Sequence, residues 1–170
     1  MTFGCRVNQA ESFEIEEALR QRGAVESRLS NADLIVVNTC TVTGRSDQGA
    51  RQAIRRLART NPGARIVVTG CYATRRPDDL ARLPNVVELV PNAEKASLGR
   101  VFDALCGPAR VERHCGHPLE PGTLGRTAIP LRVQTGCSEA CTFCIIPATR
   151  GPSRSRPLDE VCRESARLAA

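Results

Sequence analysis

Residues 34–40 read Leu-Ile-Val-Val-Asn-Thr-Cys, an apolar run that ends in two polar residues and a cysteine. Residues 65–71 repeat the pattern as Arg-Ile-Val-Val-Thr-Gly-Cys. Continuous β-branched runs of this length are typical of strands buried on both faces of a parallel sheet. We therefore predict two buried strands, at 34–38 and 65–69, each followed closely by a cysteine.

Helical patterns alternate with these strands. Apolar residues at helical spacing predict a helix over 9–22, opened by Asn8 and Glu11 as a capping box. A second apolar stripe runs along residues 50–58, and the arginines on its other face are typical of a solvated surface, with RNA contact as the alternative. The preceding stretch at 44–49, Gly-Arg-Ser-Asp-Gln-Gly, matches no phosphate-binding fingerprint and is interpreted as a turn.

A third strand and two more helices extend the same pattern. The sequence predicts a short helix near 78–83, a strand over 86–90 and a helix over 96–105. Strands that alternate with helices form parallel sheets. We therefore predict an α/β fold, a parallel sheet with flanking helices, over residues 1–106.

The rest of the chain has a different character. Residues 107–126 are rich in glycine and proline, which predicts a linker. Beyond it, residues 129–134 alternate like a new strand, and a helix is expected from about Pro157, a residue type that suits a first helical position. We expect residues 127–170 to begin a second domain, with apolar faces left exposed on 129–133 and on the last helix.

The composition restricts the class of protein. Of the 170 residues, 41% are hydrophobic and 25% are charged, which is enough to build a core and argues against an intrinsically disordered chain. No apolar run approaches the roughly 20 residues of a membrane-spanning helix, and the first residues lack a secretion signal. We therefore expect a cytoplasmic protein without a membrane partner. The net charge of +6 permits a polyanionic partner such as RNA but does not require one.

Nine cysteines in such a chain favour metal or redox chemistry over disulfides. The strongest motif is Cys137-Ser-Glu-Ala-Cys141-Thr-Phe-Cys144, directly after a predicted strand. Three thiolates on one tight loop can hold three irons of a [4Fe–4S] cluster and leave the fourth iron open for S-adenosylmethionine. A structural zinc site is the alternative, although zinc sites usually use paired Cys-x2-Cys units. Phe143 is expected to cover the cluster from water.

Three further cysteines, Cys5, Cys40 and Cys71, each follow a predicted strand. The carboxyl ends of parallel strands lie at one edge of a sheet, so we expect these thiols to converge into a second site. The alternative is that they are small buried residues in strand-to-helix turns.

Other candidates are weaker. Arg150, Arg154 and Arg156 follow the cysteine loop and are expected to present charge to a cofactor, to a phosphate backbone or to solvent. No Ser-His-Asp set or paired-carboxylate site is visible in the sequence. A zinc site in the linker is a further possibility, with the ligands Cys106, His114, Cys115 and His117.

Four stretches together resemble the methylthiotransferase family of radical S-adenosylmethionine enzymes: TFGCRVNQAES (2–12), VVNTCTVT (36–43), VTGCYA (68–73) and VQTGCSEACTFCIIPATRGPSRSRP (133–157). The opening GCRVNQ and the tail GPSRSRP are most similar to the branch that acts on threonylcarbamoyl-adenosine beside the tRNA anticodon. The other branches act on isopentenyl-adenosine or on an aspartate of a ribosomal protein.

The resemblance implies a role for each cysteine set. Cys137, Cys141 and Cys144 would bind the cluster whose open iron takes S-adenosylmethionine. A second [4Fe–4S] cluster, which carries the sulfur to be transferred, would be bound by Cys5, Cys40 and Cys71. The implied reaction converts C–H to C–SCH3 at adenosine carbon 2. One S-adenosylmethionine would donate methyl and another would yield a 5′-deoxyadenosyl radical. The implied partners are tRNA, an electron donor and a sulfur source.

The chain also departs from the family pattern. Few residues follow Cys144, whereas an eight-stranded barrel takes about 250, so only the truncated start of the radical-SAM barrel is expected. The strand expected before Cys5 is short, and Ala140 replaces an aromatic residue often found before the second cysteine. We therefore expect an enzyme fragment that is inactive alone. The alternatives are another methylthiotransferase substrate or a small non-catalytic iron–sulfur protein.

Overall fold

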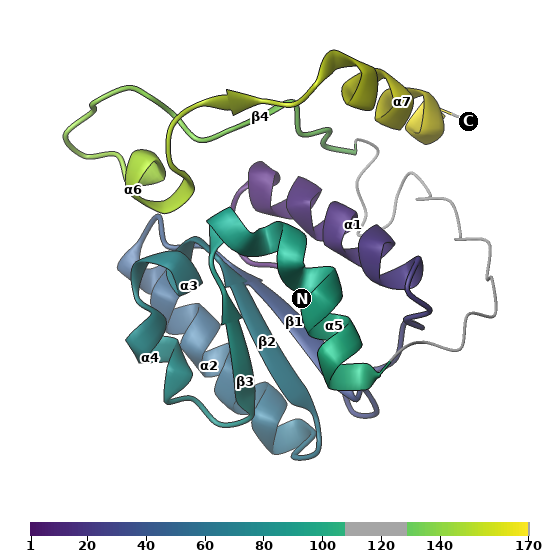
Figure 1. Cartoon of the computed structure of the whole chain (residues 1–170). Coiled ribbons are helices and arrows are strands. Elements are labelled where there is room, and N and C mark those ends of the chain that lie inside the picture. Colours follow the sequence, from purple (N-terminus) through teal and green to yellow (C-terminus); the bar gives the residue numbers. More distant parts are fainter. Residues whose placement is uncertain (108–128, 170) are drawn as a thin grey trace.

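The structure is a computed structural model that describes residues 1–107 and 129–169 (Figure 1). Its centre is a parallel sheet of three strands in the order β1 (Leu34–Thr39), β2 (Arg65–Gly70) and β3 (Val86–Val90). The three strands lie where the apolar runs predicted them. The α/β fold with a parallel sheet is therefore confirmed.

Helices cover both faces of this sheet (Figure 1). One face packs against α2 (Gly44–Thr60), α3 (Cys71–Arg75) and α4 (Pro77–Ala81). The other face packs against α1 (Arg6–Arg20) and α5 (Leu98–Cys106), and α5 is preceded by the 3-10 helix η1 (Asn92–Ser97). The sheet is thus the middle of three layers.

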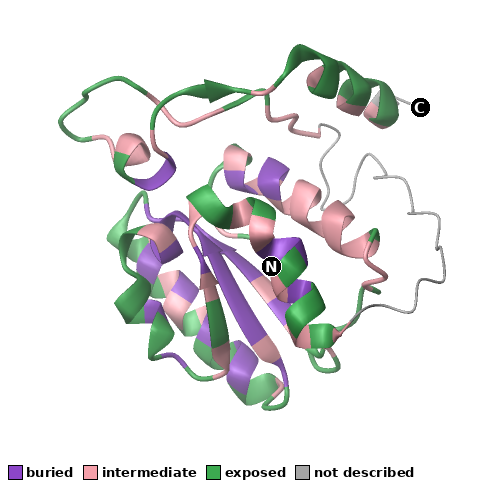
Figure 2. Ribbon diagram, viewed as in Figure 1, coloured by how far each residue is buried: buried purple, intermediate pink, exposed green. Residues whose placement is uncertain are grey.

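Alternate residues of β2 supply the two halves of the core. Ile66 and Val68 are fully buried against the α2 side, where Ile54 also has no exposed surface. Val67 points to the other side and packs in the cluster that contains Leu98 of α5. The purple strands in Figure 2 show that burial is concentrated here. Burial on both faces explains why the sequence of β2 is apolar without alternation.

The first residues of the chain extend the sheet beside β1. Thr2 forms a parallel bridge with Asn38, and the amide N–H of Phe3 donates to the carbonyl oxygen of Asn38 at 2.8 Å. The ammonium group of Met1 donates to the carbonyl oxygen of Val36 at 2.9 Å. The segment before Cys5 therefore runs as a short strand in the same direction as β1.

Residues 129–169 lie across the carboxyl edge of the sheet (Figure 1). They contain two short strands and two helices: β4 (Gln134–Thr135), α6 (Ile146–Arg150), β5 (Arg154–Ser155) and α7 (Leu158–Ala169). The expected strand over 129–134 is wrong except for its last residue. Strands β4 and β5 pair antiparallel, whereas barrel strands are parallel, so the described residues do not show the start of a barrel.

The predicted exposure of apolar groups in this region is found at two positions. Val133 is 53% exposed and Leu158, at the start of α7, is 78% exposed. The described residues include no helix long and apolar enough to cross a membrane.

Two local predictions differ from the structure. Helix α1 starts at Arg6 with Cys5 as its N-cap, so Asn8 and Glu11 lie inside the helix and form no capping box. The stretch 44–49 is the start of α2 and not a turn. The hydroxyl of Thr43 accepts a hydrogen bond from the amide of Ser46 and so caps the helix directly before its first residue, Gly44.

The helix expected over 96–105 is found as α5 at Leu98–Cys106, and the 3-10 helix η1 at Asn92–Ser97 directly precedes it. Within η1, Lys95 reaches across to the carboxylate of Glu11 on α1, which gives this segment a partner outside its own helix.

Candidate metal centre

Three cysteines lie at the carboxyl edge of the sheet. Cys40 directly follows β1, Cys71 directly follows β2, and Cys5 follows the short N-terminal strand. The parallel arrangement of the three segments places their ends at one edge, as the sequence predicted.

Two glycines allow the turns at this edge to approach closely. Gly4 has φ +101°, and a Cβ atom there would lie 2.2 Å from the Cβ of Cys40. Gly70 has φ +102°, and a Cβ atom there would lie 2.2 Å from the carbonyl oxygen of Thr39. No larger residue fits at either position without displacing its neighbour.

The thiols of Cys5 and Cys40 share a hydrogen bond. This bond is the main reason that the pKa of Cys5 is lowered to about 5; burial opposes the shift, and the amides of Asn8 and Val7 in the first turn of α1 assist it. The same bond, together with burial, raises the pKa of Cys40. The lowered pKa favours the thiolate form of Cys5, and thiolate is the form that binds metal.

Cys71 lies at the same edge of the sheet, and its sulfur accepts a hydrogen bond from Asn92 Nδ2 at 3.4 Å. In the part of the chain that the structure describes, no three Cys, His, Asp or Glu side chains stand close enough together to hold a metal ion. The structure thus brings Cys5 and Cys40 into contact and Cys71 to the same edge.

Unsatisfied polar atoms adjoin this cysteine set. Within residues 1–107 and 129–169, the buried polar atoms without a hydrogen-bond partner are Thr41 Oγ1, Asp47 Oδ1 and Asn92 Oδ1. Thr41 follows Cys40, and Asn92 contacts Cys71. Buried polar atoms normally have partners, so the unsatisfied oxygens of Thr41 and Asn92 and the three thiols together fit a site that accepts a further group. The thiol donor set suits an iron–sulfur cluster.

The second cysteine set lies on the loop between β4 and α6. The amide N–H of Cys144 donates to the carbonyl oxygen of Cys141 at 3.1 Å, and that of Cys137 donates to the carbonyl oxygen of Gly151 at 3.1 Å. Cys141 is exposed, while Cys137 and Cys144 are half-buried. The side chain of Phe143 projects into solvent and is 92% exposed. The three thiols lie on one loop but are not gathered around a common point.

A buried polar cluster joins the two regions, and we name it the Glu11 hub. The carboxylate of Glu11 pairs with Arg150 at 2.5 Å and with Lys95. Arg150 also donates to Asn8 Oδ1 at 2.5 Å, and Lys95 donates to Asn38 Oδ1 at 3.2 Å. The side chains of Arg150 and Glu11 are only 3% and 6% exposed.

The hub has an excess of positive charge. Burial raises the pKa of Glu11, but Arg150 and Lys95 more than compensate, so that its pKa is lowered. Burial lowers the pKa of Lys95. Burial alone would lower the pKa of Arg150, but the hydrogen bonds to Glu11 and the nearby negative charges raise it. One carboxylate faces two cations, so the surplus charge favours thiolates at the adjacent cysteines.

Sequence reasoning missed this hub. Arg150 was expected to present its charge to a cofactor, to phosphate or to solvent, but it is buried against α1. Arg154 is exposed, and Arg156 pairs with Glu14 at 3.2 Å. The spacing of Asn8 and Glu11, interpreted as a capping box, was the available signal.

The candidate zinc site in the linker cannot be assembled from the described residues. Cys106 is exposed at the end of α5. Its proposed companions His114, Cys115 and His117 lie outside the described residues.

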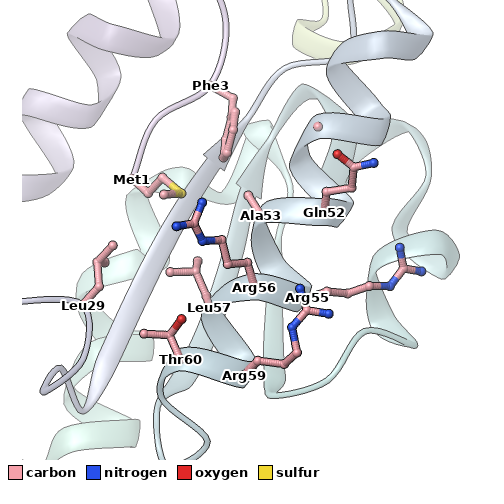
Figure 3. Close-up of a pocket in the computed structure, with 11 residues that line it drawn as sticks. Met1, Phe3, Leu29, Gln52, Ala53, Arg55, Arg56, Leu57, Arg59 and Thr60 are labelled. Carbon is pink, nitrogen blue, oxygen red and sulfur yellow. The ribbon is translucent and has the colours of Figure 1, made fainter.

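A groove lies beside the sheet, away from the cysteines. It has a volume of about 790 Å³ and an apolar floor that includes Phe3 and Leu57. Arg55, Arg56 and Arg59 of α2 line it, as Figure 3 shows. No cysteine lines this groove, so it is separate from the candidate metal centre.

Comparison with known families matches residues 1–91 to the family described as "Uncharacterized protein family UPF0004". The chain belongs to this family. The UPF0004 match contains all three cysteines of the sheet edge. The resemblance to methylthiotransferases, first based on short motifs, is confirmed over nearly the whole chain by the curated relatives.

These relatives are methylthiotransferases whose names give different substrates. The threonylcarbamoyladenosine tRNA methylthiotransferase MtaB of Bacillus subtilis is 35% identical over 98% of this chain and 39% of its own length. The ribosomal protein uS12 methylthiotransferase RimO of Myxococcus xanthus is 32% identical, with coverages of 99% and 38%. The tRNA-2-methylthio-N(6)-dimethylallyladenosine synthase of Sorangium cellulosum is also 32% identical, with the same coverages. The UPF0004 chain thus spans about two fifths of the length of these relatives.

Proposed function

We propose that this UPF0004 chain is part of a radical S-adenosylmethionine methylthiotransferase that carries two [4Fe–4S] clusters. Cys5, Cys40 and Cys71 would hold one cluster at the sheet edge. The other, which binds S-adenosylmethionine, would be held by Cys137, Cys141 and Cys144. The single observation that carries the proposal is the convergence of Cys5, Cys40 and Cys71 at one edge, with the second cysteine loop bonded to the same edge through the Glu11 hub.

The chemistry of this edge supports the assignment. The thiol pair of Cys5 and Cys40 and the excess positive charge of the Glu11 hub favour the anionic ligands that iron requires. When bound, the two clusters and S-adenosylmethionine would supply the sulfur and the radical needed to replace an unactivated C–H bond. The chain's own residues would supply the cysteine ligands and hold the two ligand sets against each other through the Glu11 hub.

The substrate that we propose is threonylcarbamoyladenosine beside the tRNA anticodon. The motifs GCRVNQ and GPSRSRP support this choice. An electron donor and a sulfur source complete the proposed set of partners, in a cytoplasmic setting. The barrel that would bind most of S-adenosylmethionine lies, in this proposal, beyond the residues described.

A pair of chimaeras tests the function. In one, this chain replaces the matching 39% of Bacillus subtilis MtaB; in the other, it replaces the matching 38% of Myxococcus xanthus RimO. Both are reconstituted anaerobically and supplied with their own substrates, and the products are identified by mass spectrometry. We expect methylthio transfer from the MtaB chimaera and its loss after Cys137→Ala.

The other results are equally informative. Transfer only from the RimO chimaera would overturn the choice of tRNA substrate. No transfer from either chimaera, while both parent enzymes are active, would overturn the methylthiotransferase proposal.

A further inference from the structure

Arg150 is the last residue of α6, and its side chain is buried against α1. It makes two hydrogen bonds with the carboxylate of Glu11, at 2.5 and 3.0 Å, and one with Asn8 Oδ1 at 2.5 Å. These partners are 139 and 142 residues away in sequence. The Arg150 side chain is only 3% exposed, and its guanidinium group is therefore held by three hydrogen bonds to α1.

Asn8 continues this connection to the cysteines of the sheet edge. Its Nδ2 donates to the carbonyl oxygens of Phe3 and Thr39, both at 2.9 Å. Thr39 precedes Cys40 directly, and Phe3 lies two residues before Cys5. The Asn8 side chain thus binds the turns before Cys5 and Cys40 through its Nδ2 and binds Arg150 through its Oδ1.

Asn92 makes a second, independent connection. Its Nδ2 donates to the sulfur of Cys71 at 3.4 Å and to the carbonyl oxygen of Thr149 at 2.7 Å. Its backbone amide donates to the hydroxyl of Thr74 in α3 at 2.9 Å. Thr149 adjoins Arg150, so the two connections reach the same turn of α6.

The other side of this turn is bonded to the second cysteine set. The carbonyl oxygen of Gly151 accepts the amide of Cys137 at 3.1 Å, and Arg150 donates to the hydroxyl of Thr135 at 3.4 Å. A continuous path of hydrogen bonds therefore runs from the turns of Cys5, Cys40 and Cys71 to the loop of Cys137.

We infer that Arg150 and Asn92 are positioning residues that dock the loop of Cys137, Cys141 and Cys144 onto the sheet edge of Cys5, Cys40 and Cys71. The docking itself rests on the contacts described. Its value for catalysis rests on the proposed function, because sulfur transfer needs the two clusters at a fixed separation.

Hydrogen exchange on the metal-free chain tests the docking directly. The variant is Arg150→Gln, and the matched control is Arg154→Gln, an exposed arginine four residues further along the same segment. In Arg150→Gln we expect the amides of residues 134–151 to exchange about tenfold faster, with β1 and β2 unchanged. Arg154→Gln should match the wild type, and Arg150→Lys, which keeps the charge but loses the planar fork, should fall between.

Asn92→Ala is a second variant that leaves the buried ion pairs in place. It removes the connection between Cys71 and Thr149 and should also speed exchange over 134–151. If Arg150→Gln loosens the sheet as well, Asn92→Ala decides the question. Unchanged exchange over 134–151 in Asn92→Ala and in Arg150→Gln, or equal acceleration in Arg154→Gln, would overturn the inference.

A spectroscopic measurement separates this inference from the proposed function. After anaerobic reconstitution with ferrous iron and sulfide and reduction with dithionite, the electron paramagnetic resonance spectrum of the wild type should show magnetic coupling between two clusters. In Arg150→Gln the iron content should stay the same and the coupling should weaken. Coupling of equal strength in both proteins would contradict the inference. If the wild type binds no iron, the proposed function fails, while hydrogen exchange still decides the docking.

Discussion

The two cysteine sets are built in different ways. Cys5, Cys40 and Cys71 are 31 or more residues apart and lie at one edge only because parallel strands end there. The other three lie within one loop, whose neighbouring strands are two residues long. The first site therefore depends on the stability of the sheet, whereas the second depends on local chain geometry and on docking through the Glu11 hub.

Glu11→Gln changes the residue at which the two regions meet. It leaves two buried cations, Arg150 and Lys95, without a carboxylate, and we expect the free energy of unfolding to fall by about 3–5 kcal/mol. The pKa of Glu11 is lowered in the folded chain, so its contribution is present above its ordinary value of 4.5 and is lost as pH falls below it.

Urea titrations at a series of pH values measure both effects. The wild type should lose stability as the pH falls from about 4.5, and Glu11→Gln should have a flatter profile in that range. Parallel profiles in the two proteins would show that the carboxylate is not ionised within the hub.

Ile54→Ala and Leu158→Ala each shorten an aliphatic side chain to a methyl group, the first beside the sheet and the second in residues 129–169. Ile54 is fully buried between α2 and the sheet, so its loss should cost about 2–5 kcal/mol. Leu158 is 78% exposed, and its loss should cost less than about 0.5 kcal/mol. Thermal unfolding followed by circular dichroism tests this difference. Equal costs would contradict the contrast between the two regions.

Gly70→Ala and Gly136→Ala compare the backbone of the two sites. Both glycines have positive φ, and a Cβ atom would meet a carbonyl oxygen, that of Thr39 at 2.2 Å or that of Pro152 at 2.1 Å. Each change should cost about 1–3 kcal/mol. In Gly70→Ala hydrogen exchange should rise in β1 and β2, and in Gly136→Ala only in residues 134–155. If hydrogen exchange in β1 also rose in Gly136→Ala, the two regions would unfold as one unit.

Cys162→Ser should have the smallest effect. Cys162 is exposed on α7 and belongs to neither set. We expect a change in stability below about 0.5 kcal/mol and the same iron content after reconstitution. A loss of iron comparable to that of Cys40→Ser would make Cys162 a ligand and would require a new assignment.

The sequence predicted the part of the fold that depends on local pattern. The apolar runs at 34–38 and 65–69 form strands because a strand buried on both faces tolerates few polar residues, and the run at 86–90 forms the partly exposed third strand. From these strands, the topology of parallel sheets was enough to bring Cys5, Cys40 and Cys71 to one edge.

Long-range pairs were beyond the reach of the sequence. Glu11 and Arg150 are 139 residues apart, and the spacing of Asn8 and Glu11 fitted a local capping box equally well. The expected strand at 129–134 failed for a related reason, since alternation describes a strand only where a neighbour is present to pair with it. Only the last of these residues has one, in β5.

Iron and acid-labile sulfide content after anaerobic reconstitution tests the central claim most directly. The measurement is made on the wild type and on a variant in which Cys137, Cys141 and Cys144 are replaced by Ala. Two clusters held by separate sets predict about eight irons per chain in the wild type and about four in the variant. About four irons in the wild type and none in the variant would contradict the account, because Cys5, Cys40 and Cys71 would then hold no cluster.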